Sequence, residues 1–396
     1  MRRISSRALS VPASPTIAID DAARSLRAQG VDVLSLGAGQ PDFETPADVR
    51  RAGIDAIEGG DTKYTAVAGT PEFRKAVAAK LLRENHVEVK SEQVMAAAGV
   101  KHALYHALLT LVEPGDEVVV PSPCWPSYRD MVRLAGGVPV DAPLDPATGF
   151  AMDPERIARA ITPRTRVLLV NSPCNPTGAV ATRGELSGIG RLALEHDLWV
   201  ITDEIYEKLL YDGAEAVSLA SLGPDLAART ITLNGLSKAY AMTGWRIGFA
   251  AGPREVIEVM TALQSQTSGN CSSIAQRAAA FALTQADPAP LAAMQRAFAA
   301  RRGLVLEAVR GWPGAGLVPP RGAFYAFVDL SAYSAALPGP RDGAALSRYL
   351  LSEARVAVVP GEAFGDARYV RISYAASETV LREALERIGS ALKLLV

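Results

Sequence analysis

The sequence has little of what several protein classes require. Only three cysteines occur among 396 residues, and no two of them form a CxxC pair. We therefore expect neither a disulfide framework nor a zinc ribbon, and a reducing, cytoplasmic environment fits best. No stretch approaches 18 consecutive apolar residues, so we expect no membrane span. The basic N-terminal stretch MRRISSRALSVPASP also lacks the apolar core of a secretory signal.

The sequence also lacks an excess of either charge. Its 41 Lys and Arg residues balance 42 Asp and Glu residues, which leaves a formal net charge of −1. This balance gives no electrostatic attraction to nucleic acid or to an anionic membrane. Hydrophobic residues make up 49% and charged residues 21%, as in folded globular proteins, and the length favours two domains. The composition favours an enzyme or binding protein for small molecules.

Short apolar runs alternate with longer helical patterns through the middle of the chain. The runs lack period-2 alternation, which is typical of strands buried on both faces. The expected strands are 117–121, 166–171, 198–203, 230–234 and 246–251, and the expected helices are 71–85, 101–112, 183–197, 254–267 and 273–285. Strands that alternate with helices predict an α/β fold, with a mostly parallel sheet and helices on both of its faces.

The pattern changes beyond about residue 300. A helix near 291–310 leads into the turn-rich GWPGAGLVPPRG, then into short strands and a final helix from about 377. The N-terminal 45 residues are loop-rich, with one helix and one short strand. We expect a large α/β domain over 46–300, and a smaller α+β domain made of 1–45 and 301–396.

Three of the expected strands run directly into polar residues. The strand at 166–171 precedes Asn175, the strand at 198–203 ends on Asp203 just before Tyr206, and the strand at 230–234 precedes Lys238. In an open α/β sheet, ligands bind outside the carboxyl ends of the strands. These four residues are therefore candidates for one site.

The chemistry of these residues converges on pyridoxal phosphate. A sheltered lysine near another cation has a lowered pKa, so Lys238 can form a Schiff base with an aldehyde. A carboxylate such as Asp203 keeps a pyridine nitrogen protonated, which the cofactor needs to act as an electron sink. Asn175 and Tyr206 can donate hydrogen bonds to the phenolic oxygen.

The phosphate of such a cofactor needs amides, hydroxyls and an arginine. The segment Ala98-Gly99-Val100-Lys101 follows a strand-like run and begins a helix, whose first amides can hold the phosphate. Ser237 and Arg246 lie close to Lys238 in sequence and would approach the same group.

Each of these features also has an ordinary structural interpretation. Asp203 alone could be a loop acid or a helix cap, Asn175-Pro176-Thr177-Gly178 a simple turn, and Arg246 a surface ion pair. Their joint order and their places at strand ends favour the cofactor site. His102 and His106 stand one helical turn apart, but no HExxH pattern accompanies them, so we expect no metal site.

The sequence resembles the class I pyridoxal-phosphate aminotransferases of fold type I, and most closely the bacterial aspartate aminotransferases. The resemblance extends almost from end to end. It is carried by the motifs GAGQPDFETP, TKYTAVAGTPEFR, EPGDEVVVPSP, NSPCNPTGAV, TDEIYEKLLY, NGLSKAYAMTGWRIGFAAGP, GAFYAF and VAVVPGEAFG.

The resemblance implies a role for each matching residue. Lys238 would bind the cofactor covalently and shuttle a proton, assisted by Asp203 and Tyr206, and Trp125 would stack on the cofactor ring. The remaining cofactor contacts it implies are Gly99, Val100, Lys101, Asn175, Ser237 and Arg246. Arg371 would grip the α-carboxylate of the substrate as a bidentate fork, with Gly39, Trp125 and Asn175 beside it. Lys101 matches a position that helps to recognise a distal acidic group.

The resemblance also implies a homodimer, in which Tyr64 reaches the phosphate in the active site of the neighbouring subunit. The expected function is therefore transfer of an amino group from an amino acid, such as aspartate or glutamate, to a 2-oxo acid. Its expected partners are these small molecules and a second copy of the chain.

Some positions depart from the family pattern. The segment 11–16 (VPASPT), which contains Pro12, carries no cation, Arg129 follows the tryptophan segment, and Arg277 stands where an aromatic residue is usual. These changes leave open an alternative on the same scaffold, a pyridoxal-phosphate enzyme of β- or γ-elimination, replacement or cyclisation. A regulator that only senses the cofactor is the second alternative, although the near-zero net charge does not favour a DNA-binding protein.

Overall fold

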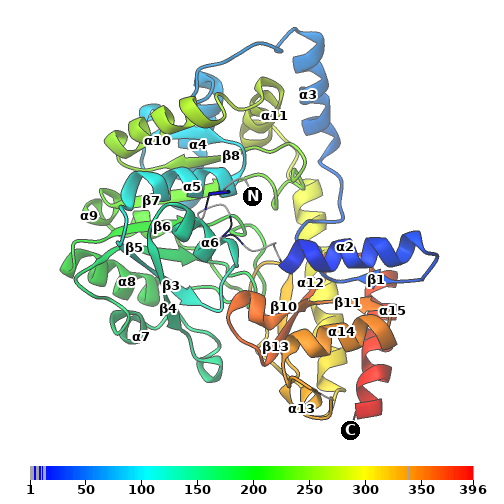
Figure 1. The fold of residues 1–396 in the computed structure, drawn as a ribbon. Helices are drawn as coiled ribbons and strands as arrows, with labels where there is room; N and C mark the ends of the chain where they lie inside the picture. Colours follow the sequence, from blue (N-terminus) through cyan, green and yellow to red (C-terminus); the bar gives the residue numbers. More distant parts are fainter. Residues whose placement is uncertain (1–3, 6–8, 10, 12–14, 338, 396) are drawn as a thin grey trace.

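A seven-stranded sheet forms the centre of the larger part of the protein (Figure 1). The computed structural model describes residues 4–5, 9, 11, 15–337 and 339–395. In sheet order the strands are β2 Val94–Ala97, β8 Gly248–Ala251, β7 Thr230–Gly235, β6 Trp199–Asp203, β5 Thr165–Asn171, β3 Glu117–Ser122 and β4 Val138–Pro143. Strand β8 runs opposite to the other six strands of this sheet, so the prediction of a mostly parallel sheet is confirmed.

Helices cover both faces of this sheet (Figure 1). They are α4 Pro71–Lys80, α5 Val100–Leu111, α6 Ser127–Leu134, α7 Pro154–Ala158, α8 Arg183–Glu195, α9 Pro224–Ala227, α10 Arg254–Thr267 and α11 Ser273–Thr284, and α3 Ala47–Glu58 packs against α11. In β5, Val167 and Leu169 pack into one hydrophobic core, whereas Leu168 and Val170 pack into another. Because successive side chains of a strand point to opposite faces, an uninterrupted apolar run is what a strand covered on both sides requires.

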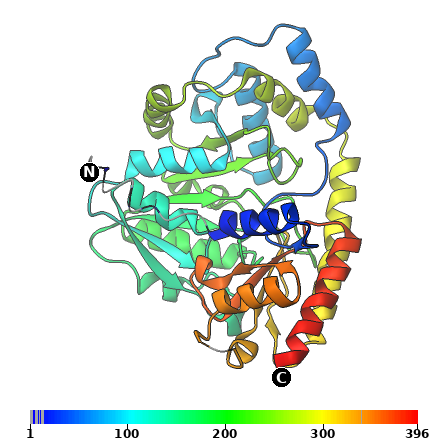
Figure 2. The same cartoon turned by 45° about the vertical axis from the view of Figure 1, so that its right-hand side comes forward.

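A smaller part lies beside the large sheet. It contains a four-stranded antiparallel sheet in the order β12-β13-β10-β9 and a two-stranded parallel pair, β1 with β11. The strands are β1 Leu34–Ser35, β9 Gly316–Leu317, β10 Tyr325–Asp329, β11 Val356–Ala357, β12 Val359–Pro360 and β13 Tyr369–Ser373, and the helices are α2 Pro15–Ala28, α12 Ala289–Arg310, α13 Ser331–Ser334, α14 Gly343–Glu353 and α15 Glu378–Leu392. Figure 2 shows α15 running alongside α12.

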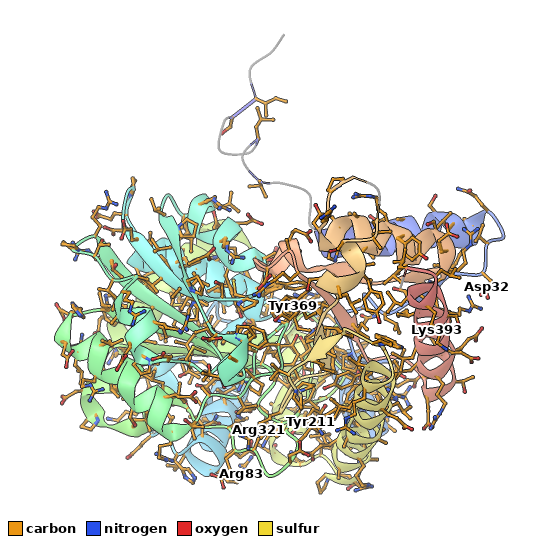
Figure 3. All side chains as sticks on the ribbon, turned by 90° about the horizontal axis from the view of Figure 1, so that it is seen from below. Asp32, Arg83, Tyr211, Arg321, Tyr369 and Lys393 are labelled. Carbon is orange, nitrogen blue, oxygen red and sulfur yellow. The ribbon has the colours of Figure 1, made fainter. Side chains whose placement is uncertain are left out.

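The N-terminal segment packs with the C-terminal part, because β1 pairs with β11. The predicted division of the chain into 46–300 and 1–45 plus 301–396 stays a prediction, and α12 runs continuously through residue 300. The two parts also join through the backbone, where the amide of Tyr211 donates to the carbonyl of Arg321 at 2.9 Å (Figure 3). Among the described residues, none of the helices combines the length and apolar character needed to cross a bilayer.

The expected elements differ from the observed ones at a few ends. The helix expected over 71–85 is α-helical only to Lys80 and continues as one π-helical turn, Leu81–Asn85. The strand expected over 246–251 begins at Gly248, because Arg246 adopts a left-handed backbone with φ of +54°. Strand β4 was not expected, since its VPVDAP sequence carries two prolines and mixed polarity, which an edge strand tolerates.

A buried polar cluster lies directly behind the end of β6. The Lys80 ammonium contacts the carboxylate of Glu207 and the Asn85 Oδ1 atom, the latter at 2.6 Å. Glu204 Oε1 accepts hydrogen bonds from Ser218 at 2.8 Å and from Thr202 at 3.1 Å. The π-helical turn that carries Asn85 therefore fixes the segment that follows Asp203.

Burial, with the nearby Glu207 carboxylate as the second cause, raises the pKa of Glu204 to about 8. In the unfolded chain the same carboxyl ionises near pH 4.5. Between these values the folded protein holds a proton that the unfolded chain has released, so this group lowers the free energy of unfolding as pH rises.

We predict that Glu204→Gln becomes progressively more stable than the wild type between about pH 4.5 and pH 8, by at most about 1.4 kcal/mol per pH unit. The amide retains the oxygen that accepts from Ser218 and Thr202 but cannot ionise. Urea unfolding at a series of pH values measures the difference. Glu58→Gln on the exposed face of α3 is the control and should give a flat difference. A flat difference for Glu204→Gln as well would contradict the prediction.

Candidate active site

One cavity of about 510 Å³ opens at the carboxyl ends of the central strands, between the large sheet and the smaller part. Twelve of the thirteen residues predicted for the site line this cavity. They are Gly39, Gly99, Val100, Lys101, Trp125, Asn175, Asp203, Tyr206, Ser237, Lys238, Arg246 and Arg371. The residues are far apart in sequence and are brought together by the order of the strands.

Parallel pairing of β5 with β6 brings the Asn175 turn, which follows β5, next to Asp203 at the end of β6. Asn171 stands opposite Asp203 in the register, and its side-chain amide donates to the Asp203 carbonyl at 2.9 Å. Its Oδ1 atom accepts from the backbone amide of Asn175 at 3.0 Å. The buried Asn171 side chain therefore holds the Asn175 turn at the end of β6, a role that the sequence analysis missed.

Asp203 is a buried carboxylate at the last position of β6. The Tyr128 hydroxyl donates to its Oδ2 atom at 2.8 Å, and the Ile205 amide donates to its Oδ1 atom at 3.2 Å. Burial raises the pKa of Asp203 to about 6, although both hydrogen bonds and the nearby Lys238 act in the opposite direction. The carboxylate would gain most from a further cationic partner inside the cavity.

Tyr128 is the most important contact that the sequence analysis did not find. It lies on α6, three residues after Trp125, and is 1% exposed. A tyrosine on an amphipathic helix normally indicates core packing. The sequence did contain one indication of this contact, the Tyr128 hydroxyl group, because a hydroxyl on a deeply buried ring needs a hydrogen-bond partner.

Lys238 follows β7 and points into the cavity, where its Nζ atom donates to the Gly39 carbonyl at 2.5 Å. Burial lowers the pKa of Lys238 to about 8, and the Arg371 guanidinium contributes in the same direction. Asp203 opposes these effects by favouring the charged amine. At pH 7 the neutral fraction of this amine is therefore far larger than that of an ordinary lysine, which favours its action as a nucleophile and a base.

The N-terminus of α5 forms another wall of the cavity, with Gly99 in the N-cap position. Gly99 has φ of +86°, and a Cβ atom there would lie 2.6 Å from Arg246 Nη2. The glycine therefore leaves a space between the guanidinium and the first amides of the helix, which have no acceptor inside the helix. Ser237 borders the same cavity. This arrangement fits a phosphate group.

Arg371 occupies the opposite wall, on β13. Its Nη1 atom donates to Asn175 Oδ1 at 3.0 Å, and its Nη2 atom donates to the Gly37 carbonyl at 2.7 Å. The guanidinium also lies over the Tyr325 ring, 4.3 Å from its centroid. Rigidly held, buried and planar, it has the geometry for binding a carboxylate.

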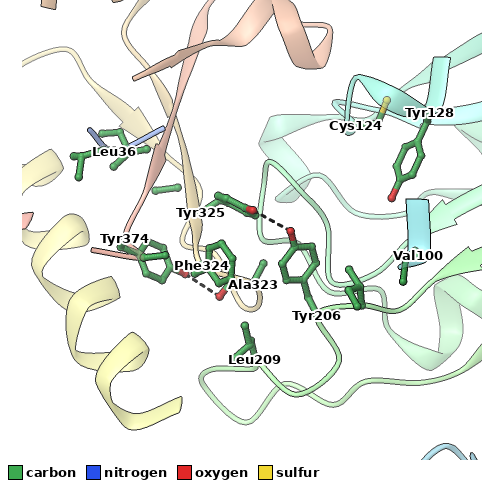
Figure 4. Close-up of a cluster of buried hydrophobic side chains, with 14 of the residues drawn as sticks. Leu36, Val100, Cys124, Tyr128, Tyr206, Leu209, Ala323, Phe324, Tyr325 and Tyr374 are labelled. Atoms are coloured by element: carbon green, nitrogen blue, oxygen red, sulfur yellow. Dashed lines mark hydrogen bonds between the residues drawn. The ribbon is translucent and has the colours of Figure 1, made fainter. Parts of the chain in front are cut away.

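The hydroxyl groups of Tyr206 and Tyr325 are hydrogen-bonded to each other at 2.9 Å (Figure 4). Burial, together with the proximity of Tyr325, raises the pKa of Tyr206 well above its ordinary value. The Tyr206 hydroxyl is therefore protonated and available as a donor at the cavity surface. Tyr325 lies within the GAFYAF motif, but its role was not predicted.

Lys101 is another basic residue of the cavity, and its ammonium lies 4.6 Å from the centroid of the Trp125 ring. Burial, followed by repulsion from Arg246, lowers the pKa of Lys101. The ionisable side chains other than tyrosine that line the cavity are the four bases Lys101, Lys238, Arg246 and Arg371 and the one acid Asp203. Such an excess of cations fits ligands that carry several negative charges.

Several other residues singled out in the sequence lie outside this cavity. Tyr64 is 96% exposed, on the segment between α3 and α4. Arg277 is exposed on α11, and Pro12 lies outside the described residues. The rings of His102 and His106 pack together with centroids 4.1 Å apart. The described residues contain no group of three or more potential metal ligands.

The cavity fits the expected cofactor at both ends. At one end, the buried Asp203 carboxylate accepts two hydrogen bonds and can also pair with a protonated ring nitrogen. At the other end, the space that Gly99 leaves beside Arg246 can hold a phosphate. Lys238 lies in the same cavity as both, with its pKa lowered for reaction with an aldehyde.

Comparison with known proteins gives one consistent result. Residues 31–388 match the family of class I and II aminotransferases. A probable aspartate/prephenate aminotransferase of Thermus aquaticus is 46% identical over 99% of this chain and 100% of its own length. The aspartate aminotransferase of Thermus thermophilus, solved with maleate, is 46% identical with a TM-score of 0.93, over 99% of this chain and 100% of its own. The aspartate aminotransferase of Rhizobium meliloti is 42% identical with a TM-score of 0.96, over the full length of both chains.

The electrostatic coupling between Lys238 and Asp203 gives a testable prediction. In the protein without ligands, competitive labelling with trace acetic anhydride should give Lys238 an apparent pKa near 8. Asp203→Asn removes the charge that favours the ammonium form, so Lys238 should react faster at pH 7. The exposed Lys393 is the internal control, and its labelling should not change. Equal labelling of Lys238 in the two proteins would contradict the coupling.

Proposed function

The chain belongs to the class I and II aminotransferases, and we propose that it uses pyridoxal phosphate to exchange amino groups between a dicarboxylic amino acid and a 2-oxo acid. One observation carries the proposal. One cavity is lined by Lys238, whose pKa is lowered, by the buried Asp203, and by the glycine-lined space beside Arg246. Arg371 lines the same cavity.

The proposed cofactor would be held at three places. Asp203 would pair with the ring nitrogen, supported by the hydrogen bond from Tyr128. Arg246, Ser237 and the amides that follow Gly99 would bind the phosphate, and Asn175 and Tyr206 would donate to the phenolic oxygen. Trp125 would cover the ring. When bound, pyridoxal phosphate supplies an aldehyde and an electron-withdrawing ring that stabilises negative charge at the substrate Cα.

The residues of the chain supply the proton transfers. Lys238 Nζ, with its pKa lowered to about 8, would accept the proton from the substrate Cα and later return one to the product. The ionised Asp203 would keep the ring nitrogen protonated through both steps. Because Asp203 is buried, water does not weaken this interaction.

Two cations at separate places in the cavity support a dicarboxylic substrate. Arg371 would bind the α-carboxylate as a fork, with Gly39 and Asn175 beside it. Lys101, above Trp125, would meet the distal carboxylate. Relatives named aspartate aminotransferase or aspartate/prephenate aminotransferase, and the maleate in the Thermus thermophilus structure, agree with this assignment.

Product formation in two separate halves tests the function. Given aspartate or glutamate alone, the holoenzyme should complete one half-reaction and then stop, because its acceptor is missing. Addition of a 2-oxo acid should restore continuous turnover. Lys238→Ala should lower this turnover by at least about 10²–10⁴-fold because the proton-transfer group is lost, whereas the exposed Lys393→Ala should not affect it. Continuous turnover without a 2-oxo acid would instead indicate an elimination or replacement enzyme.

We also propose that the active site is completed by a second copy of the chain. Tyr64 is the one predicted site residue that does not reach the cavity of its own subunit, and it is almost fully exposed. The side chains of Ile54 and Ile57 on the adjacent helix α3 are 45% and 54% exposed. An exposed apolar surface next to an unused site residue fits a two-fold interface, in which Tyr64 would reach the partner's phosphate.

Subunit complementation tests this proposal. Tyr64→Asp and Lys238→Ala should each be nearly inactive as purified homodimers. After subunit exchange, one of the two sites in each mixed dimer combines an intact Lys238 with an intact Tyr64. Equal mixing should therefore restore about a quarter of wild-type activity. Proven exchange without recovery, or an active monomer in sedimentation, would contradict shared sites.

The cytoplasmic location expected from the cysteine content stays a prediction.

A further inference from the structure

Arg129 is a residue that the cofactor chemistry leaves without a role, yet its side chain is only 13% exposed. It lies on α6, next to Tyr128 of the active site. Its Nε atom donates to Asp141 Oδ1 at 2.8 Å, and Asp141 belongs to the edge strand β4 of the large sheet. The guanidinium is thus anchored to the large part of the protein.

The other end of the guanidinium reaches the smaller part. Its Nη2 atom donates to the Phe364 carbonyl at 3.4 Å. The next residue, Gly365, has φ of +104°, and a Cβ atom there would lie 2.5 Å from the same nitrogen. Arg129 therefore packs directly against the Gly365 backbone, where a side chain would displace the guanidinium and strain the left-handed backbone. The backbone amide of Cys124 donates to the same Phe364 carbonyl at 3.0 Å.

Phe364 connects this contact to the active site. It ends the 3₁₀ helix Gly361–Phe364, which joins β12 to β13, the strand that carries Arg371. The Phe364 ring is fully buried, and its centroid lies 4.9 Å from the Arg371 guanidinium. Phe364 thus packs against the guanidinium in addition to Tyr325. A shift of Phe364 would remove one of the supports that orient the Arg371 fork.

We propose that Arg129, held by Asp141, is a positioning residue that fixes Phe364 and thereby preorganises Arg371 for the substrate carboxylate. This inference rests on the proposed role of Arg371 in binding the α-carboxylate. Arg129 itself touches neither substrate nor cofactor in this arrangement. Its guanidinium suits the task because a planar fork can bind the Asp141 carboxylate and the Phe364 carbonyl together, which a lysine does less well.

Binding of maleate to the holoenzyme provides the test. Arg129→Ala should raise the Kd for maleate by about 2- to 30-fold and leave Tm and cofactor retention close to wild type. Asp141→Asn should raise it in the same direction, and Arg129→Lys should recover part of the loss. Arg133→Ala is the matched control, since Arg133 lies on the same helix in an exposed pair with Asp130 and should leave the Kd unchanged.

A double-mutant cycle separates positioning from a general structural effect. In an Arg371→Lys background the fork is already lost, so Arg129→Ala should add little further weakening. Fully additive effects, or an unchanged Kd in Arg129→Ala, would overturn the inference. If Arg129→Ala unfolds, the cycle is run with Asp141→Asn and decides in the same way. If Arg371→Lys alone leaves the Kd unchanged, the proposed role of Arg371 fails instead, so the two failures are distinguishable.

Discussion

Parallel pairing of three central strands, β5, β6 and β7, is the constraint on which the active site depends. Their backbone hydrogen bonds fix the register, and Asn171 stands opposite Asp203 at the shared carboxyl edge. Asn175, Asp203, Tyr206 and Lys238 follow within a few residues of these ends, so their positions derive from main-chain geometry. Such positions are precise because a slip of one residue would turn every side chain of the strand to the opposite face.

Charge imposes the second constraint, since the cavity gathers four basic side chains around one buried acid. Burial, followed by repulsion from nearby guanidinium groups, lowers the pKa values of Lys101 and Lys238, while burial raises that of Asp203. Each shift moves the group toward its neutral form, because burial disfavours the charged form of any side chain. An anionic ligand bound beside Lys101 and Lys238 would favour their charged forms and so raise the pKa values of both lysines again.

The sequence allowed most of this arrangement to be predicted, because its main signals are local. Apolar runs without alternation predicted the central strands, and the polar residues directly after them predicted side chains that line one cavity. The missing parts depend on contacts between distant segments. Tyr128 reaches Asp203 across 75 positions, and Tyr325 reaches Tyr206 across 119, so neither pairing has a periodic signature. The left-handed backbone of Arg246 likewise follows from its surroundings rather than from its residue type.

The pairing of β1 with β11 joins residues 34–35 to residues 356–357. During synthesis, strand β1 therefore cannot pair until residues 356–357 have left the ribosome. Contacts so distant in sequence form slowly, because a long loop must close before they bring any stabilisation. The large sheet, whose strands all lie between residues 94 and 251, can assemble earlier. The smaller part should thus be the last to fold, after the large sheet has formed.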